Sequence, residues 1–134
     1  MKNIINFFFL TLIFLISLAS CKSTLRIGYE TAGLFKKGDS YSKMQDTINK
    51  EPYLEEEVVL KRTNEKFKVT FYKRWIQTYT GENSFFSRDK YDVFVFTYKN
   101  EKLYFWGNID DYKRSNDKTV NELGLIISEI WAND

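Results

Sequence analysis

Ser40 and Lys43 have the S-x-x-K spacing at which a lysine can activate a serine nucleophile. Enzymes that work in this way carry two further motifs, S-D-N and K-T-G, which complete the site around the serine. The segment Lys118-Thr119-Val120 does not supply the second of these motifs. The sequence therefore predicts that Ser40 caps a helix and that Lys43 is a solvated lysine.

Two other groups of residues have the spacing or the charge of ligand sites. Gly33 and Gly38 are spaced as in a phosphate-binding loop, but Asp39 stands where that loop needs its lysine and would repel phosphate. The acidic runs Asp110-Asp111 and Glu55-Glu56-Glu57 join neighbours in sequence, which point to opposite faces of a strand. Calcium needs a richer set of oxygen ligands, and no D-x-D-x-D-G loop is present. We expect solvated charges around turns, with no metal and no cofactor.

The composition narrows the classes of function. The chain has 134 residues and no histidine, which removes the commonest general base and the commonest metal ligand. Its 20 Lys and Arg residues are interspersed with 18 Asp and Glu residues, so it lacks the basic stripe of a nucleic-acid-binding protein. We expect that the protein is not an enzyme and has no nucleic-acid partner.

The N-terminus has the pattern of a lipoprotein signal. Lys2 precedes an apolar run from Phe7 to Ile16, which is shorter than the roughly 20 apolar residues of a transmembrane helix. Leu18-Ala19-Ser20-Cys21 then resembles the lipobox, the motif cut by the lipoprotein signal peptidase. This resemblance implies cleavage between Ser20 and Cys21 and a diacylglyceryl group on the Cys21 sulfur. The lipid would attach the chain to a membrane.

This pattern divides the chain into three parts. We expect a signal peptide at residues 1–20, a lipidated tether and lead-in at residues 21–37, and one globular α+β domain at residues 38–134. The chain contains one cysteine, so a packed core rather than a disulfide must stabilise the domain.

Periodicity predicts two helices and four strands. Apolar residues at helical spacing predict helices near residues 40–50 and 117–131, and Pro52 ends the first. Gly124 inside the second helix indicates a close approach to the sheet. Alternating and apolar runs predict strands near residues 58–60, 67–79, 91–98 and 103–106, with a loop at residues 81–90. The order predicts an α+β fold, an antiparallel β-meander with an N-terminal and a C-terminal helix packed on one face.

Both faces of the last predicted hairpin are apolar. Val93 and Val95 fall on one face of the third strand, and large aromatic residues fall on the other. If the helices cover one face, the other is covered by loop 81–90 or by the tether, or it is an exposed patch that binds a partner. The expected interaction face consists of Phe94, Phe96, Tyr98, Tyr104 and Trp106.

Gly38, Ser40, Met44, Ile48 and Pro52 follow one another at a spacing close to the helix motif G-x-[ST]-x-x-x-V-x-x-x-L-G-x-P. With this motif the domain resembles the SmpA/OmlA (BamE-like) family of small outer-membrane lipoproteins, in which it opens the fold. The hairpin from Phe96 to Leu103 resembles the family's closing strands. The chain departs from the pattern at Asn49, where the family has a glycine, at Pro52, which falls one residue late, and at Glu101, which stands near the expected turn glycine. The resemblance implies a non-catalytic module of an envelope assembly.

The residue after the cysteine indicates a location. Aspartate at this position is the general retention signal for the inner membrane, and this chain has Lys22. We therefore expect a lipid-anchored protein of the outer membrane that faces the periplasm and binds an envelope protein. The alternative is a ligand-binding lipoprotein, or an inhibitor lipoprotein that occludes an enzyme with loop 81–90.

Overall fold

The computed structural model describes residues 27–78 and 88–134. The expected signal peptide, Cys21 and most of the expected loop 81–90 lie outside the described residues. For residues 75–78 and 88–90, only the backbone is considered.

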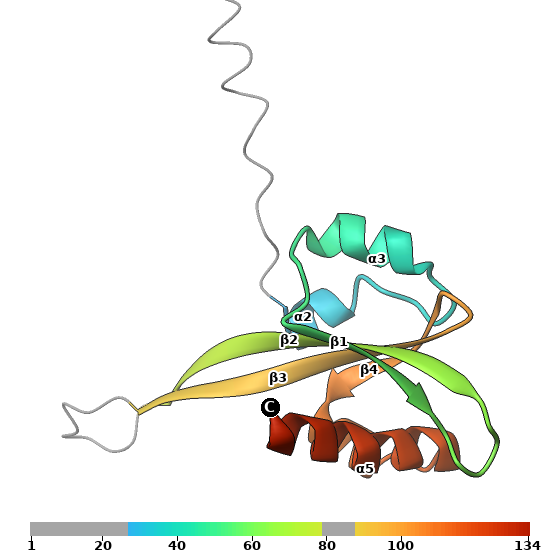
Figure 1. The fold of residues 1–134 in the computed structure, drawn as a ribbon. Helices are drawn as coiled ribbons and strands as arrows, with labels where there is room; N and C mark the ends of the chain where they lie inside the picture. Colours follow the sequence, from blue (N-terminus) through green and yellow to red (C-terminus); the bar gives the residue numbers. More distant parts are fainter. Residues whose placement is uncertain (1–26, 79–87) are drawn as a thin grey trace, which may run out of the picture.

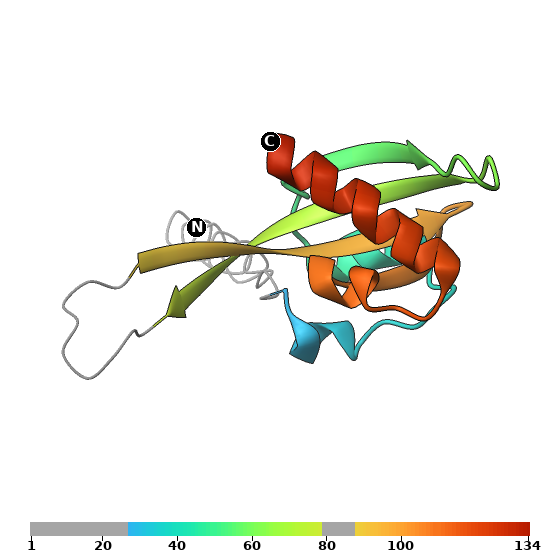
Figure 2. The same cartoon turned by 90° about the horizontal axis from the view of Figure 1, so that it is seen from below.

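The four strands form one antiparallel sheet in which chain neighbours pair in the order β1-β2-β3-β4. They are β1 (Leu54–Val59), β2 (Lys66–Thr78), β3 (Arg88–Lys99) and β4 (Lys102–Asn108). The predicted α+β class and the four-stranded meander are therefore confirmed. The pairing of β2 with β3 continues to Thr78 and Arg88, and Figure 2 shows this hairpin projecting beyond the rest of the sheet.

The two predicted helices are present as α3 (Tyr41–Ile48) and α5 (Lys118–Asn133). The Ser40 hydroxyl accepts a hydrogen bond from the Lys43 backbone N–H at 3.2 Å, which confirms the predicted helix cap. Asn49 ends α3 in the left-handed conformation, with φ 49°. Asparagine tolerates that conformation better than other residues with a side chain, which explains how α3 can end without a glycine.

Two short helices were not predicted from the sequence. They are α2 (Tyr29–Ala32) and α4 (Ile109–Lys113). Asn108 caps α4 because its side chain accepts a hydrogen bond from the Asp111 N–H at 2.9 Å, and Asp111 in return accepts from the Asn108 N–H at 2.8 Å. Helices of one turn carry no measurable apolar period, so a pattern search does not find them.

The main helices lie on opposite faces of the sheet, so the prediction that both pack on one face is wrong. Figure 1 shows α2 and α3 on one side of the strands and α5 on the other. The physical reason lies in β3, where valines point to one face and phenylalanines to the other, so that both faces must be covered.

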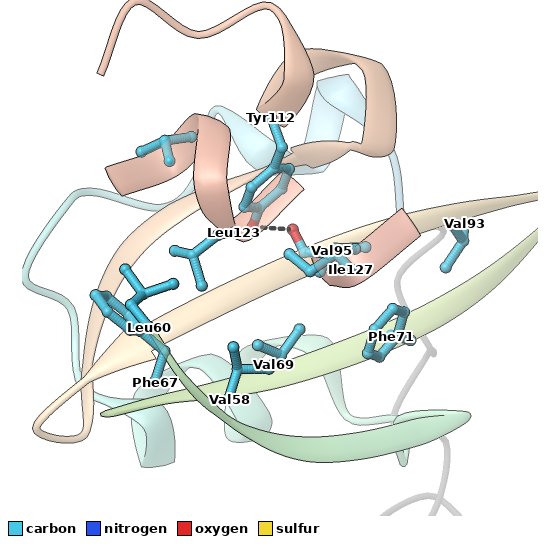
Figure 3. Close-up of a cluster of buried hydrophobic side chains, with 11 residues drawn as sticks. Val58, Leu60, Phe67, Val69, Phe71, Val93, Val95, Tyr112, Leu123 and Ile127 are labelled. Atoms are coloured by element: carbon cyan, nitrogen blue, oxygen red, sulfur yellow. Dashed lines mark hydrogen bonds between the residues drawn. The ribbon is translucent and has the colours of Figure 1, made fainter. Parts of the chain in front are cut away.

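The face under α5 holds the first buried cluster, which we call the α5-face cluster (Figure 3). Tyr112 of α4 is fully buried there, and its hydroxyl donates a hydrogen bond to the Val95 carbonyl at 3.2 Å. This bond satisfies a buried polar group that would otherwise be costly to desolvate. The buried members are Val58, Leu60, Phe67, Val69, Phe71, Val93, Val95, Tyr112, Val120, Leu123 and Ile127.

The opposite face holds the second buried cluster, which we call the α3-face cluster. Phe35 packs edge-on against Phe96, with ring centroids 5.7 Å apart. Its buried members are Ile27, Ala32, Phe35, Met44, Ile48, Tyr72, Phe94, Phe96, Tyr98 and Leu103. The expected domain start at residue 38 therefore needs correction, because the lead-in from Ile27 onward is part of the core.

Gly124 lies at a close approach, as expected, but its neighbour is α4 and not the sheet. A Cβ atom built on Gly124 would lie 2.8 Å from the Tyr112 Cβ and 2.9 Å from the Lys113 backbone nitrogen. The glycine therefore allows α5 to pack directly on the backbone of α4.

Candidate binding groove

Three of the five residues of the expected interaction face are core residues. Phe94 and Phe96 have 0% of their surface exposed, and Tyr98 has 1%. The prediction that they form an exposed binding face is wrong, because the segment from Ile27 to Ile48 covers them. Coverage by the tether was one of the alternatives that the sequence left open.

The other two residues, Tyr104 and Trp106, are half-buried and lie on opposite faces of the sheet. Thr97 pairs with Phe105 and Tyr98 pairs with Leu103, so that Tyr104 is the extra residue of a β-bulge. Tyr104 therefore packs against the α5-face cluster, and Trp106 packs against the α3-face cluster. Strict alternation placed them on one face, and no signal in the sequence locates the bulge.

A groove of about 480 Å³ lies beside β4, and it brings Tyr104 and Trp106 together with residues that sequence reasoning missed. Phe105 adds a third aromatic side chain to its wall. The full set of lining residues is Lys37, Tyr104, Phe105, Trp106, Ser115, Asp117 and Val120. The groove is therefore mainly aromatic, with one cationic and one anionic group at its walls.

Two polar contacts hold Tyr104 in place in this groove. The Lys37 ammonium nitrogen lies 4.4 Å from the centroid of the Tyr104 ring, within the range of a cation–π interaction. The Tyr104 hydroxyl donates a hydrogen bond to Asp117 Oδ2 at 3.3 Å. Partial burial and the nearby Asp117 carboxylate raise the pKa of Tyr104, so the ring stays neutral at physiological pH.

Asp117 also fixes one end of the groove to α5. Its Oδ1 accepts hydrogen bonds from the backbone N–H groups of Thr119 at 2.8 Å and Val120 at 3.3 Å. Asp117 is therefore the helix cap, at the residue where the second helix was expected to begin. A carboxylate held in this way can accept a hydrogen bond from a ligand without rearranging.

The serine–lysine pair of the S-x-x-K motif is not arranged for nucleophilic activation. The Lys43 ammonium donates to Asp39 Oδ1 at 2.7 Å, so its contact is a carboxylate. Hydrogen bonds from Lys43 and from the Lys36 backbone N–H lower the pKa of Asp39. Asp39 therefore stays ionised as the partner of the Lys43 ammonium.

Acidic residues of the run Glu55-Glu56-Glu57 pair with basic side chains of the neighbouring strand. Glu57 of β1 forms an ion pair with Lys66 of β2 at 3.3 Å, and Glu55 lies 3.9 Å from Lys68. In residues 27–78 and 88–134, no group of three or more acidic, histidine or cysteine side chains could hold a metal ion.

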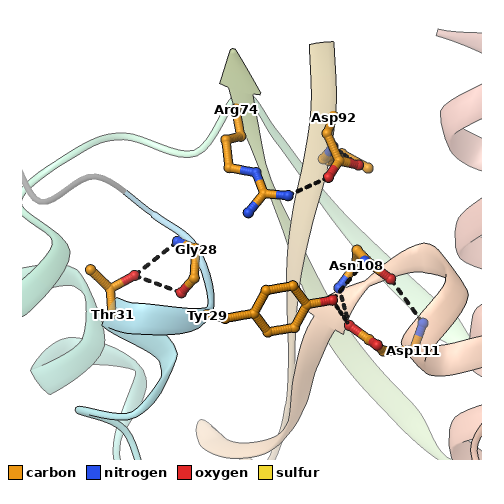
Figure 4. A network of polar contacts seen from close by, with 8 residues as sticks. Gly28, Tyr29, Thr31, Arg74, Asp92, Asn108 and Asp111 are labelled. Carbon is orange, nitrogen blue, oxygen red and sulfur yellow. Dashed lines mark hydrogen bonds and ion pairs between the residues drawn. The ribbon is translucent and has the colours of Figure 1, made fainter. Parts of the chain in front are cut away.

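A polar network ties the beginning of the described chain to the end of β4 (Figure 4). The Tyr29 hydroxyl donates to Asp111 Oδ2 at 2.6 Å and accepts from the Asn108 side-chain amide at 2.6 Å. Burial of the hydroxyl and its hydrogen bond to Asp111 raise the pKa of Tyr29 to about 12. These bonds hold α2 against α4.

The same figure shows how the chain is held at Gly28. A Cβ atom on Gly28 would lie 3.2 Å from Arg74 Nη1, so the guanidinium packs over the glycine backbone. Arg74 in turn forms an ion pair with Asp92 of β3 at 2.5 Å. The Thr31 hydroxyl donates to the Gly28 carbonyl at 2.8 Å. Gly28, near the start of the described residues, is therefore held against the paired strands β2 and β3.

No known family, no curated protein and no solved structure matches this chain. Within the part of the chain that the structure describes, no helix is long and apolar enough to cross a membrane.

Proposed function

We propose that the chain is a non-catalytic lipoprotein of the cell envelope, anchored through Cys21, and that its domain is a protein-interaction module. The proposal is carried by the spacing of two features. The motif Leu18-Ala19-Ser20-Cys21 ends six residues before Ile27, and Ile27 is already buried in the core, with 6% of its surface exposed. A lipid signal followed so closely by a packed domain is the arrangement of an anchored module.

The groove beside β4 supports the interaction part of the proposal. Tyr104, Phe105 and Trp106 supply aromatic surface, which is enriched at the centres of protein interfaces. Lys37 and Asp117 supply polar groups of opposite sign at its walls. A partner with an apolar side chain between polar groups would fit this groove. The resemblance to the BamE-like family points to a partner in outer-membrane assembly or maintenance.

A ligand-binding lipoprotein is the second candidate, because the groove volume of about 480 Å³ lies within the range of small-molecule sites. In that case the occupant is a small amphipathic molecule and not a protein segment. The inhibitor form of this alternative depends on loop 81–90, most of which lies outside the described residues.

Replacing Cys21 by serine is expected to abolish incorporation of labelled fatty acid and to release the protein from the membrane fraction. The reason is that serine lacks the thiolate that takes the diacylglyceryl group. The measurement is metabolic labelling with a radioactive fatty acid, followed by fractionation of the cells. The matched control is Lys22→Asp, which leaves Cys21 in place and should retain the label while moving the protein to the inner membrane. Label on the Cys21→Ser protein would refute the lipid anchor.

A photo-crosslinking amino acid in place of Trp106 is expected to give a discrete adduct of protein size in living cells. The same amino acid in place of Leu125, which is 60% exposed on α5 and outside the groove, should give none. The adducts are detected by electrophoresis and identified by mass spectrometry. A small-molecule adduct at position 106 would favour the ligand-binding alternative. An adduct at position 125 alone would exclude the groove as the binding site.

A further inference from the structure

We propose that the exposed side of residues 29–36 lies against the bilayer that holds the Cys21 lipid, with Leu34 in its headgroup region. This inference rests on the proposed lipid anchor and adds an orientation to it. The ligand of this surface is an anionic phospholipid bilayer.

The length of the connection brings this surface to the membrane. Cys21 lies six residues before Ile27, and an extended chain spans at most about 3.6 Å per residue. Ile27 therefore stays within roughly 20 Å of the lipid attachment point, which is less than the roughly 30 Å diameter of a small domain. The side of the domain opposite the entry point therefore cannot lie against the bilayer, which leaves the entry side and its surroundings to face it.

That side exposes two large apolar residues close to the entry point. Tyr29 and Leu34 have 56% and 57% of their surface exposed, although Ala32 and Phe35 between and beside them are buried. Burial of Phe35 against Phe96 fixes the direction of the segment, so that Leu34 points outward. Among the described residues, Leu34 belongs to neither buried cluster nor to the side chains packed against them. Leucine and tyrosine are residue types that bind at the membrane interface.

The charge of the segment matches an anionic surface. Residues 22–37 carry four positive side chains, Lys22, Arg26, Lys36 and Lys37, and one negative side chain, Glu30. The rest of the chain, residues 38–134, carries fifteen positive and seventeen negative side chains. The positive charge is therefore concentrated in the segment next to the anchor, and an anionic lipid surface attracts positive charge in this position.

The inference is tested with two single-cysteine variants of the mature lipidated protein, Leu34→Cys and Leu125→Cys. Because Cys21 is the only cysteine and carries the lipid in the proposed function, the new cysteine is the only free thiol. The two leucines are matched in exposure, at 57% and 60%. Each variant is labelled with an environment-sensitive fluorophore and reconstituted in vesicles of phosphatidylethanolamine and phosphatidylglycerol. Quenching by spin-labelled phospholipids is then measured.

We expect several-fold stronger quenching and a blue-shifted emission at position 34, and emission typical of water at position 125. Equal quenching at the two positions, in protein whose lipid is confirmed by mass spectrometry, would overturn the proposed orientation and leave the lipid anchor intact. Absence of the lipid in that mass spectrum would instead refute the anchor, and the orientation with it. Equal melting temperatures of the two variants and the parent protein verify that both are folded.

Discussion

Replacing Phe96 by alanine is expected to lower the free energy of unfolding by about 3 to 5 kcal/mol. Phe96 has no exposed surface, and its ring lies 5.7 Å from those of Phe35 and Tyr72 and 5.4 Å from that of Phe94. Truncation therefore removes apolar burial and leaves a cavity at the centre of the α3-face cluster. The loss is a large share of the roughly 5 to 15 kcal/mol that stabilises a typical domain. Chemical denaturation followed by tryptophan fluorescence measures it.

The matched control for this experiment is Tyr91→Ala on the same strand. Tyr91 is 60% exposed, so its truncation should change the free energy of unfolding by no more than about 0.5 kcal/mol. Similar stabilities of the two variants would mean that Phe96 is not a core residue. That result would favour an exposed aromatic binding face on β3, as the sequence predicted.

Replacing Gly124 by alanine is expected to destabilise the protein by about 1 to 3 kcal/mol, although alanine is the better helix former. Helix propensity alone predicts a gain of about 1 kcal/mol. The new Cβ atom, however, would lie 2.9 Å from the backbone carbonyl carbon of Tyr112 and from the Lys113 backbone nitrogen. Backbone atoms cannot rotate away as a side chain can, so α4 and α5 must separate. The melting temperature and denaturant midpoint report the loss.

The control is Gly33→Ala, the same substitution at a position where we expect it to raise the stability of the protein. Gly33 has helical dihedral angles, φ −65° and ψ −16°, and a Cβ atom there would meet only the Glu30 carbonyl, at 3.6 Å. The substitution should stabilise the protein by about 0.4 to 1 kcal/mol, because it reduces the entropy of the unfolded chain. A stabilising effect of Gly124→Ala as well would show that α4 and α5 are less closely packed than in the structure.

The sequence was sufficient for the elements whose signals are local and periodic. The helical spacing of Met44 and Ile48 predicted α3, and both residues are buried. The spacing of Val120, Leu123 and Ile127 likewise predicted α5, and all three are buried. The hairpin from β3 to β4 followed from two apolar runs with a short polar connection. Its turn contains Asn100 and Glu101 at positive φ, 53° and 59°, which is the geometry of a tight two-residue turn.

The sequence was not sufficient for contacts between distant segments. Ile27 and Phe35 cover Phe94 and Phe96, about 60 residues further along the chain, and no period in the lead-in reveals this packing. Without that cover, the aromatic side of β3 resembled an exposed patch. The groove was missed because the β-bulge at Tyr104 changes the face to which this residue points. The alternation of residues along a strand does not show where a bulge occurs. The lipid anchor and the resemblance to BamE-like proteins remain predictions.

The two buried clusters need different lengths of the chain to be synthesised before they can form. Every buried member of the α3-face cluster lies between Ile27 and Leu103, whereas the α5-face cluster needs Tyr112, Val120, Leu123 and Ile127. As the chain emerges from the ribosome, the side chains that cover one face of the sheet are complete well before those that cover the other. A product that stops before α5 therefore has its α3 face covered and its α5 face open. Such a fragment is a target for chaperones and proteases, and for pairing with another unfinished copy through the open face.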